Sequence, residues 1–266
     1  IAVLAIGNGA RESVAASIAA LGTNTLIIMP GSQNNGGVRS GAFGRTTLTP
    51  ADIDAVVTEC RAVMAGTPMT QNNAQIVYQN QNWQTQVTGG GLDYPIIRNW
   101  TIESGRYFMD DEVRSAAKVC VIGQVIVENL FPNEDPIDKV IRVRTVPMRI
   151  IGTLAPKGAS AFGQSQDDLV LVPYTSAMRR IFHQEYLRSA LASANTADDV
   201  DRAKEQITGL LRQRHRIEAG DDDDFTIRTQ AEFAQTAEAS SRVMTMLLGG
   251  IASVSLLVCG IGIMNI

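Results

Sequence analysis

Residues 243–266 read VMTMLLGGIASVSLLVCGIGIMNI, a run without a single charged side chain. A helix over this run would be about 36 Å long at 1.5 Å per residue, enough for a bilayer hydrocarbon core of about 30 Å. The run therefore predicts a transmembrane helix; the alternative is a fully buried helix of a soluble protein. Its small residues, such as Gly249, Gly250, Gly260 and Gly262, would let a second membrane helix approach closely, so we expect it to pack in a bundle.

The predicted helix begins well before the apolar run. Thr229 and Glu232 have the spacing of a capping box, in which the two residues satisfy each other's backbone N–H groups. No proline follows as far as Ile266, and Arg242 marks the expected membrane interface. We therefore expect a rigid rod that leads from a folded domain into the bilayer.

The first residues of the chain, IAVLAIGNGA (1–10), are also apolar, but they are too few to cross a membrane, which takes about 20 residues. They are either a buried strand or the end of a transmembrane helix, and the apolar run at the other end favours the helix. Residues 9–21 then have a helical pattern that stops at Gly22.

The middle of the chain predicts a mixed fold. With 45% hydrophobic and 19% charged residues, a folded domain with a sizeable core is expected. Short strands alternate with helices at both ends of this region, around a strand-rich centre, so we predict an α+β fold: a discontinuous α/β subdomain with an inserted strand-rich one. Strands are expected at residues 23–29, two within 74–88, 118–122, 140–144, 148–154, 169–172, 187–193 and 225–228. Helices are expected at residues 49–65, 124–130, from 175 onwards and at 196–215, with Gly-rich loops at 32–45 and 156–166.

Cysteine and charge content exclude several classes of function. The net charge is −4 and no Lys/Arg-rich run is present, so nucleic-acid binding is not expected. There is no Cys-x-x-Cys pair and there are only two histidines, His183 and His215, which we expect at the surface or at helix ends, so a zinc site is not expected. Cys60 and Cys120 could form a disulfide in an oxidising compartment, a question that the sequence leaves open.

Several short motifs are weak candidates for chemistry. Ser115-x-x-Lys118 lacks the accompanying motifs of a serine acyl-transfer enzyme, and Gly89–Gly91 lacks the Lys-Ser/Thr of a P-loop. Gly158–Gly163 is one residue too long for a nucleophile elbow. Asp221–Asp224 lacks calcium-loop spacing and is interpreted as a solvated acidic loop, with cation binding as the alternative.

Paired carboxylates are a further candidate, because Asp110–Glu112 and Asp167–Asp168 are acidic, but nothing in the sequence places these two groups together. We therefore predict no catalytic, cofactor-binding or metal-binding residue, and a coupling or binding domain rather than an enzyme.

The order of several motifs is similar to that of MacB-type ABC transporter permeases, of the MacB/FtsX-like superfamily. The motifs cover essentially the whole chain. They are Gly9–Val14 with Leu21–Leu26 and Pro30-Gly31, then Gly105-Arg-Tyr-Phe108, Lys118–Gly123, Asn129-Leu-Phe131, Ile151-Gly152, Lys157-Gly158 and Gln166–Pro173.

This resemblance implies a Porter-like part at residues 23–90 and 167–228, with a Sabre-like insertion at 91–166. Residues 1–22 would end transmembrane helix 1 and its stalk, and residues 229–266 would form the stalk and transmembrane helix 2. It implies an inner-membrane permease with a periplasmic domain that works as a homodimer or paired permease. ATP and Mg²⁺ would bind a nucleotide-binding domain elsewhere, fused or separate.

The implied function is mechanotransmission, in which ATP hydrolysis moves the stalk helices and amphiphiles are exported through an adaptor and an outer-membrane channel. Loops 32–45 and 156–166 are expected to contact the adaptor or the facing protomer. Alternatives within the superfamily are a lipoprotein-releasing permease and an FtsX-like regulator. From other classes, a membrane-anchored enzyme and a passive sensor or adhesion module stay open.

Overall fold

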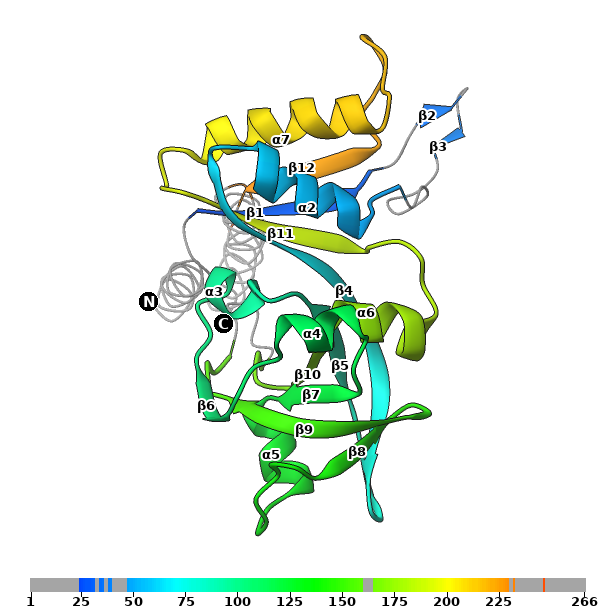
Figure 1. The fold of residues 1–266 in the computed structure, drawn as a ribbon, viewed down its shortest axis with the longest axis vertical. Helices are drawn as coiled ribbons and strands as arrows, with labels where there is room; N and C mark the ends of the chain where they lie inside the picture. Colours follow the sequence, from blue (N-terminus) through cyan, green and yellow to red (C-terminus); the bar gives the residue numbers. More distant parts are fainter. Residues whose placement is uncertain are drawn as a thin grey trace, which may run out of the picture.

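The computed structural model describes residues 24–31, 34–35, 38–39, 47–159 and 165–229, together with residues 232 and 246. Figure 1 shows two halves stacked along the long axis of the molecule, joined by strand β4. The apolar run 243–266, the predicted helix at 9–21 and the first residues of the chain lie outside the described residues. Among the residues described, no helix is both long and apolar enough to cross a membrane.

The upper half is an antiparallel sheet with two helices on one face (Figure 1). The strand order is β12 (Phe225–Thr229), β1 (Thr25–Pro30), β11 (Ser189–Ala194) and the first part of β4 (Val63–Tyr78). The helices are α2 (Pro50–Glu59) and α7 (Val200–Arg214). In α7, Ala203, Ile207 and Leu211 recur every four residues, which places all three buried side chains on the face that packs on the sheet.

In the lower half the strands close into a ring. The second part of β4 pairs with β5 (Gln81–Gly90), followed in order by β10 (Leu169–Pro173), β7 (Val119–Ile122) and β9 (Val146–Leu154). Strand β8 (Val140–Val143) pairs with both β9 and β4, and so completes the ring, while β6 (Ile102–Gly105) lies outside it on β9.

The inside of the ring is filled with apolar side chains, because alternate residues of each strand point inward. Helix α5 (Gln124–Leu130) adds Ile126 and Leu130 to this core. A third cluster lies between the halves, where α3 (Tyr94–Ile97) and α4 (Asp110–Arg114) pack; it joins Leu191 of β11 to Leu171 of β10. The two halves therefore share buried surface as well as a strand.

Strand β4 is the element common to both halves. Residues 63–69 pair with β11, and residues 70–78 pair with β5 in an unbroken register from Thr70↔Gly89 to Tyr78↔Gln81. The hairpin turn at Gln79 has a positive φ of 50°, as two-residue hairpin turns require. A single strand of 16 residues thus passes from one half into the other.

Several predicted elements are confirmed. Helix α5 has the predicted limits, and Thr49 caps α2 with Pro50 in its first turn. The strands predicted at 23–29, 118–122, 140–144, 148–154, 169–172, 187–193 and 225–228 correspond to β1, β7, β8, β9, β10, β11 and β12, with ends shifted by up to two residues. The mixed α and β content is therefore as predicted, while the division into Porter-like and Sabre-like parts stays a prediction.

Other predictions were wrong. Helix α2 ends at Glu59 instead of near residue 65, because Cys60 is extended and the chain turns to start β4. Helix α7 begins at Val200, not after Thr196; the Thr196 hydroxyl donates instead to the side chain of Asp199, the actual N-cap.

The strands expected within 74–88 belong to a longer hairpin, and the glycines at its end do not interrupt it. Strand β5 runs through Gly89 to Gly90. A Cβ on Gly89 would lie 2.6 Å from Cβ of Ala177 and 2.9 Å from Cγ2 of Thr70, so a glycine is needed for close packing. The predicted helix from residue 175 is a short α6 (Tyr174–Ser176) that continues as a π-helix, η1 (Ala177–Phe182).

Candidate functional site

The end of β12 is fastened to helix α7 by a polar clamp of three residues: Thr229, Glu232 and Lys204. The Thr229 N–H donates to Oε2 of Glu232 (3.3 Å), and the Glu232 N–H donates to Oγ1 of Thr229 (3.2 Å). The predicted capping box is therefore confirmed. Lys204 Nζ lies 2.6 Å from Oε1 of Glu232, and this hydrogen bond lowers the pKa of the Glu232 carboxyl. The clamp links the point where the chain leaves the sheet to the helix that covers it.

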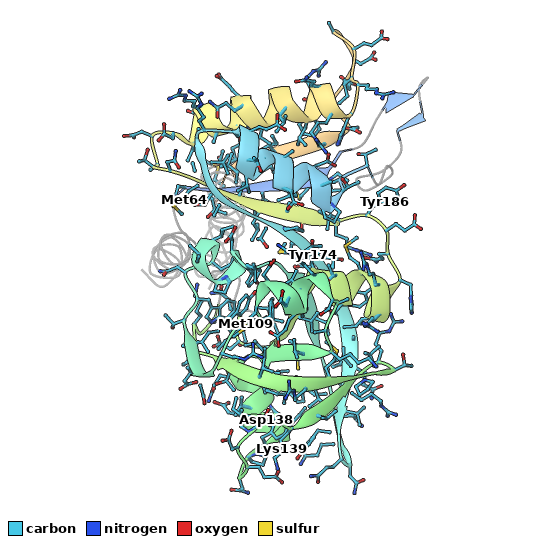
Figure 2. The ribbon with its side chains drawn as sticks, in the orientation of Figure 1. Met64, Met109, Asp138, Lys139, Tyr174 and Tyr186 are labelled. Atoms are coloured by element: carbon cyan, nitrogen blue, oxygen red, sulfur yellow. The ribbon has the colours of Figure 1, made fainter. Side chains whose placement is uncertain are left out.

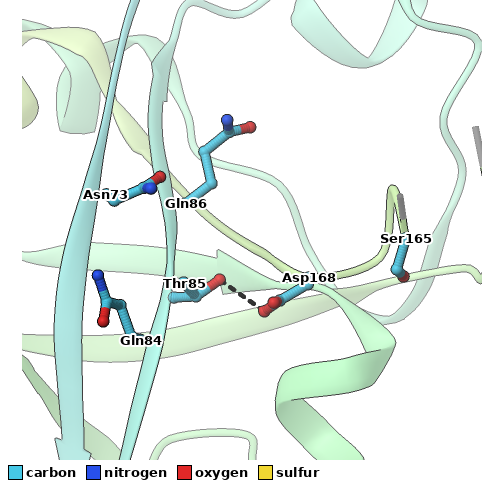
Figure 3. A pocket seen from close by; sticks show the side chains of 6 residues that line it. All are labelled: Asn73, Gln84, Thr85, Gln86, Ser165 and Asp168. Carbon is cyan, nitrogen blue, oxygen red and sulfur yellow. Dashed lines mark hydrogen bonds between the residues drawn. The ribbon is translucent and has the colours of Figure 1, made fainter. Parts of the chain in front are cut away.

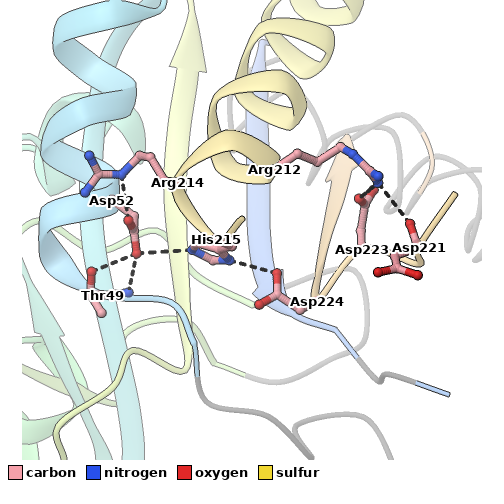
Figure 4. A network of polar contacts seen from close by, with 8 residues as sticks. All are labelled: Thr49, Asp52, Arg212, Arg214, His215, Asp221, Asp223 and Asp224. Atoms are coloured by element: carbon pink, nitrogen blue, oxygen red, sulfur yellow. Dashed lines mark hydrogen bonds and ion pairs between the residues drawn. The ribbon is translucent and has the colours of Figure 1, made fainter. Parts of the chain in front are cut away.

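A buried polar network lies at the other end of α7 (Figure 4). His215 follows the last turn of the helix, and its ring bridges two carboxylates. Its Nδ1 lies 2.8 Å from Oδ1 of Asp224, and its Nε2 lies 3.4 Å from Oδ2 of Asp52. All three side chains are less than a tenth exposed. The network therefore joins α7, α2 and the start of β12.

Asp52 is the most heavily hydrogen-bonded member of this network. Arg214 Nε donates to its Oδ1 (2.8 Å), and the backbone N–H and hydroxyl of Thr49 donate to its Oδ2 (2.9 and 2.7 Å). Burial disfavours the charged form, but the hydrogen bonds from Arg214 and Thr49 and the charge of His215 outweigh it, and the pKa of Asp52 is lowered. Asp52 therefore has two roles: it caps the start of α2 through Thr49, and it forms an ion pair with Arg214 of α7.

The network confirms one prediction and corrects another. His215 lies at a helix end, as predicted, and its side chain is buried. The acidic run 221–224 is not a freely solvated loop: Asp224 is 4% exposed, and Arg212 of α7 binds Asp223 and the carbonyl oxygen of Asp221. A sequence pattern could not pair these residues, because Asp52 and His215 are 163 positions apart.

A polar hollow of about 590 Å³ lies beside the β4–β5 hairpin (Figure 3). Among the residues that the structure describes, six line it, and all six are polar: Asn73, Gln84, Thr85, Gln86, Ser165 and Asp168. Of these six residues, the sequence singles out only Asp168, as part of the acidic pair Asp167–Asp168. The strand register is what brings these side chains together.

The motifs that carry the family resemblance have structural roles. Gly105 has a φ of +76°, and a Cβ there would lie 2.3 Å from the carbonyl oxygen of Ile151. The Arg106 guanidinium forms two bonds of 2.7 Å to Glu112, and the Tyr107 hydroxyl donates to the carbonyl oxygen of Gly91 (2.9 Å). The motif therefore fixes the segment between β6 and α4.

The Lys157-Gly158 motif fixes a second loop. The Asp167 carboxylate accepts the N–H groups of Lys157 (2.7 Å) and Gly158 (2.8 Å), which closes the base of loop 156–166. Lys157 Nζ donates to the carbonyl oxygen of Arg98 and lies 5.1 Å from the ring centre of Trp100. Burial and the neighbouring Arg98 lower the pKa of Lys157 to about 8.

The weak chemical candidates lie apart from one another. The Ser115 hydroxyl donates to the carbonyl oxygen of Asp111 (2.7 Å), while Lys118 is exposed. The two acidic groups have separate partners: Glu112 pairs with Arg106, whereas Asp168 accepts bonds from Trp83 and Thr85. Residues 160–163 of the predicted elbow lie outside the described residues. In the part of the chain that the structure describes, no three potential metal ligands converge.

Cys60 and Cys120 are both free thiols, so the disulfide left open by the sequence is not formed. Cys60 belongs to the core of the upper half, and Cys120 belongs to the core inside the ring. Burial raises the pKa of both thiols.

Exposed apolar side chains are scattered. Figure 2 shows Met64 beside the upper sheet, Met109 at the middle of the molecule and Tyr186 on the opposite side. Their exposed fractions are 52%, 59% and 41%. Of the two loops predicted to contact a partner, residues 32–45 contain the small hairpin of β2 (Asn34–Asn35) and β3 (Val38–Arg39). Residues 156–166 contain one bridge, Ala159↔Ser165.

Comparison with known proteins gives one consistent result. The family profile described as "MacB-like periplasmic core domain" matches residues 1–210. The Macrolide export ATP-binding/permease protein MacB of Azoarcus sp. (strain BH72) is 37% identical over 266 residues, covering 100% of this chain and 39% of that protein. The protein of the same name from Marinobacter nauticus is also 37% identical, with coverages of 100% and 40%. The chain thus spans about two fifths of the length of these relatives.

Solved structures show the same fold. The periplasmic region of MacB from Actinobacillus actinomycetemcomitans matches with a TM-score of 0.68 at 23% identity, covering 83% of this chain and 95% of that one. The extracellular domain of the noncanonic ABC-type transporter YknZ from Gram-positive bacteria matches with a TM-score of 0.63 at 16% identity, with coverages of 77% and 100%. With the profile match over most of its length, the chain belongs to the family of MacB-like periplasmic core domains.

Proposed function

We propose that this chain is the extracytoplasmic domain of an inner-membrane ABC permease that couples cytosolic ATP hydrolysis to the export of drugs, peptides or other amphiphiles by mechanotransmission. Family membership and relatives named for macrolide export support the transporter class. The observation that carries the mechanical part is the clamp of Thr229, Glu232 and Lys204. It fixes the start of the segment predicted as stalk and transmembrane helix 2, residues 229–266, to the domain.

A movement of that segment would reach both halves through continuous contacts. Strand β12 pairs with β1 along five residues, β1 pairs with β11, and β11 pairs with β4. Helix α7, which holds Glu232 through Lys204, packs on the same sheet. Since β4 continues into the ring of strands, a displacement at Glu232 would be passed on by a hydrogen-bonded sheet and not by a flexible linker.

The proposed organisation follows the resemblance. Residues 23–90 and 167–228 form a Porter-like part, residues 91–166 a Sabre-like insertion, and residues 1–22 the end of transmembrane helix 1. The permease works as a homodimer or pair, with a periplasmic adaptor and an outer-membrane channel as partners. ATP and Mg²⁺ bind a nucleotide-binding domain outside this chain, and this domain itself is not catalytic. Loops 32–45 and 156–166 contact the adaptor or the facing protomer.

The test is to break the rigid connection in the full-length transporter. A flexible Gly-Ser insertion after Arg242 is expected to uncouple the pump: ATPase activity stays near that of the parent, while export in cells is lost. An Ala-rich, helix-forming insertion of the same length is the matched control for the added residues. Export that survives the flexible insertion with unchanged ATPase activity would show that rigid transmission is wrong.

A second experiment addresses the clamp itself. Lys204→Glu replaces the attraction to Glu232 with repulsion, and it is expected to reduce export per ATP hydrolysed. Arg202→Glu makes the same charge change on an exposed residue of the same helix, and it is expected to leave export unchanged. The side chains of Lys204 and Glu232 are 34% and 41% exposed, so losing their ion pair should lower stability only slightly, on the order of 1 kcal/mol or less. Equal levels of folded protein in the parent and the variant would show that lost export does not come from unfolding.

A further inference from the structure

The polar hollow on the β4–β5 hairpin has the character of a ligand site. Its volume of about 590 Å³ lies within the range of roughly 300–1,000 Å³ typical of small-molecule sites. Such sites are usually lined mainly by apolar side chains, whereas the six described residues that line this one are all polar. A ligand that is polar over most of its surface is therefore the one that fits.

The charges of the lining residues narrow the class of ligand. Asp168 is the only ionisable side chain among the six, so the hollow offers no cation to an anionic ligand. Asn73, Gln84 and Gln86 each present a carboxamide, which both donates and accepts hydrogen bonds. Ser165 adds a hydroxyl group, whereas the buried Thr85 hydroxyl already donates to Asp168. This mixture matches the hydroxyl groups of a sugar, each of which also donates and accepts.

The strand register holds the carboxamides in place. Asn73 lies opposite Gln86, and Gln75 lies opposite Gln84, in the unbroken β4–β5 pairing. Directly opposed residues have Cβ atoms about 5 Å apart, so neighbouring carboxamides can reach one compact ligand. The backbone of β5 pairs with β4 along almost the whole strand, and from Gln86 onward it also pairs with β10.

Hydrogen bonds hold one oxygen of the Asp168 carboxylate in place and leave the other oxygen available to a ligand. Its Oδ1 accepts the indole N–H of Trp83 (3.0 Å) and the hydroxyl of Thr85 (2.7 Å). Its Oδ2 has no hydrogen-bond partner among the residues that the structure describes. Figure 3 shows the carboxylate facing the hollow, between Thr85 and Ser165. A carboxylate held in this way is a strong acceptor for ligand hydroxyl groups.

We propose that this hollow binds a neutral glycan, one or two sugar rings of a short oligosaccharide or of a longer glycan strand. This site does not depend on the proposed transport mechanism, because it lies on the hairpin and away from the clamp at Glu232. A periplasmic core domain can meet both free oligosaccharides and the glycan of the cell wall, and the hollow would recognise the chemistry that the two share.

The test uses the chain in detergent micelles with three probes: N-acetylchitohexaose, maltohexaose and purified cell-wall glycan in a pull-down. The side-chain NH₂ signals of Asn73, Gln84 and Gln86 in ¹H–¹⁵N spectra report on the lining groups directly. Titration with at least one hexasaccharide is expected to shift them. The double variant Gln84→Ala/Gln86→Ala and the variant Asp168→Asn should each weaken binding at least tenfold, whereas Gln213→Ala on the exposed face of α7 should not.

Each outcome is decisive. Binding of either hexasaccharide, lost in the hollow variants, supports the site, and the pull-down then shows whether polymeric glycan is bound as well. No shift with either hexasaccharide at 10-fold molar excess up to millimolar concentration overturns the proposal. Binding that is unaffected by the double variant places the glycan elsewhere and overturns it too. Circular dichroism of each variant checks that lost binding does not come from unfolding.

Discussion

Replacing Asp52 tests how much the buried polar network contributes to the stability of the upper half. In Asp52→Asn the side chain keeps its shape, but its NH₂ group must face either Thr49 or Arg214, both of which are donors to the carboxylate. Removing one partner of a buried ion pair costs about 3–5 kcal/mol, and losing an N-cap interaction costs about 1 kcal/mol. Since the Arg214 side chain is 34% exposed, water recovers part of this, and we expect a loss of about 2–3 kcal/mol.

The measurement is urea and thermal unfolding of the chain in detergent, followed by circular dichroism. A loss of this size corresponds to a fall in Tm of about 4–12 °C for a domain of this length. Asp54→Asn is the matched control, because Asp54 lies on the same helix but is exposed; it should change stability by less than about 0.5 kcal/mol. Equal effects of the two variants, or none from Asp52→Asn, would refute the reasoning.

The same variant gives a pH test. The pKa of Asp52 is lowered in the folded chain, whereas an unfolded aspartate has a pKa of about 3.9. A lowered folded pKa means that the ionised group stabilises the fold above the unfolded value, and that this stability is lost as the pH falls through the folded value. The stability difference between parent and Asp52→Asn should therefore shrink as the pH falls below about 4. A difference that stays the same or grows below about pH 4 would contradict this.

Two glycines and two cysteines allow further tests. A Cβ added at Gly209 in α7 would have no neighbouring atom within 4 Å, so Gly209→Ala should raise the free energy of unfolding in urea by about 0.5–1 kcal/mol. Gly123→Ala would place Cβ 2.1 Å from the carbonyl oxygen of Asp167, and it should lower stability by more than about 3 kcal/mol or prevent folding. Because Cys60 and Cys120 are buried and their pKa values are raised, neither should react with N-ethylmaleimide at pH 7.5 until urea is added; mass spectrometry of a variant without the tail cysteine would show this.

Sequence patterns predicted correctly those elements whose ends are determined by residues only a few positions away. Helix α5 begins after Gly123 and ends at Leu130, as predicted, and the Thr49 and Thr229 capping residues act through neighbours three positions away. Helix α2 was predicted too long because Cys60–Ala62 has no strong stop signal. Its end is set by the pairing of β4 with β11, which lies far along the chain.

The buried network around His215 and the polar hollow could not be predicted from the sequence. Asp224 belongs to an acidic run that has the composition of a loop, and only the fold brings it to His215. The hollow depends on the register between Asn73 and Gln86 and on the approach of Asp168 to β5. The π-helix η1 has no simple sequence signal either, since its pattern of residues is that of an ordinary helix.

The long strand β4 has a consequence for how the chain is made. Strand β5, which pairs with residues 70–78 of β4, is synthesised directly after it. Residues 63–69 of β4 pair with β11, where Ser189 lies opposite Met69, and β11 is synthesised much later. At roughly 5–20 residues per second, synthesis of the roughly 120 intervening residues takes about 6–24 s. Throughout that time an edge of β4, and the whole of β1, has no strand to pair with and is open to neighbouring nascent chains. Assembly of the upper half is thus a late event, and variants that slow it should be found first as aggregates and not as folded but inactive protein.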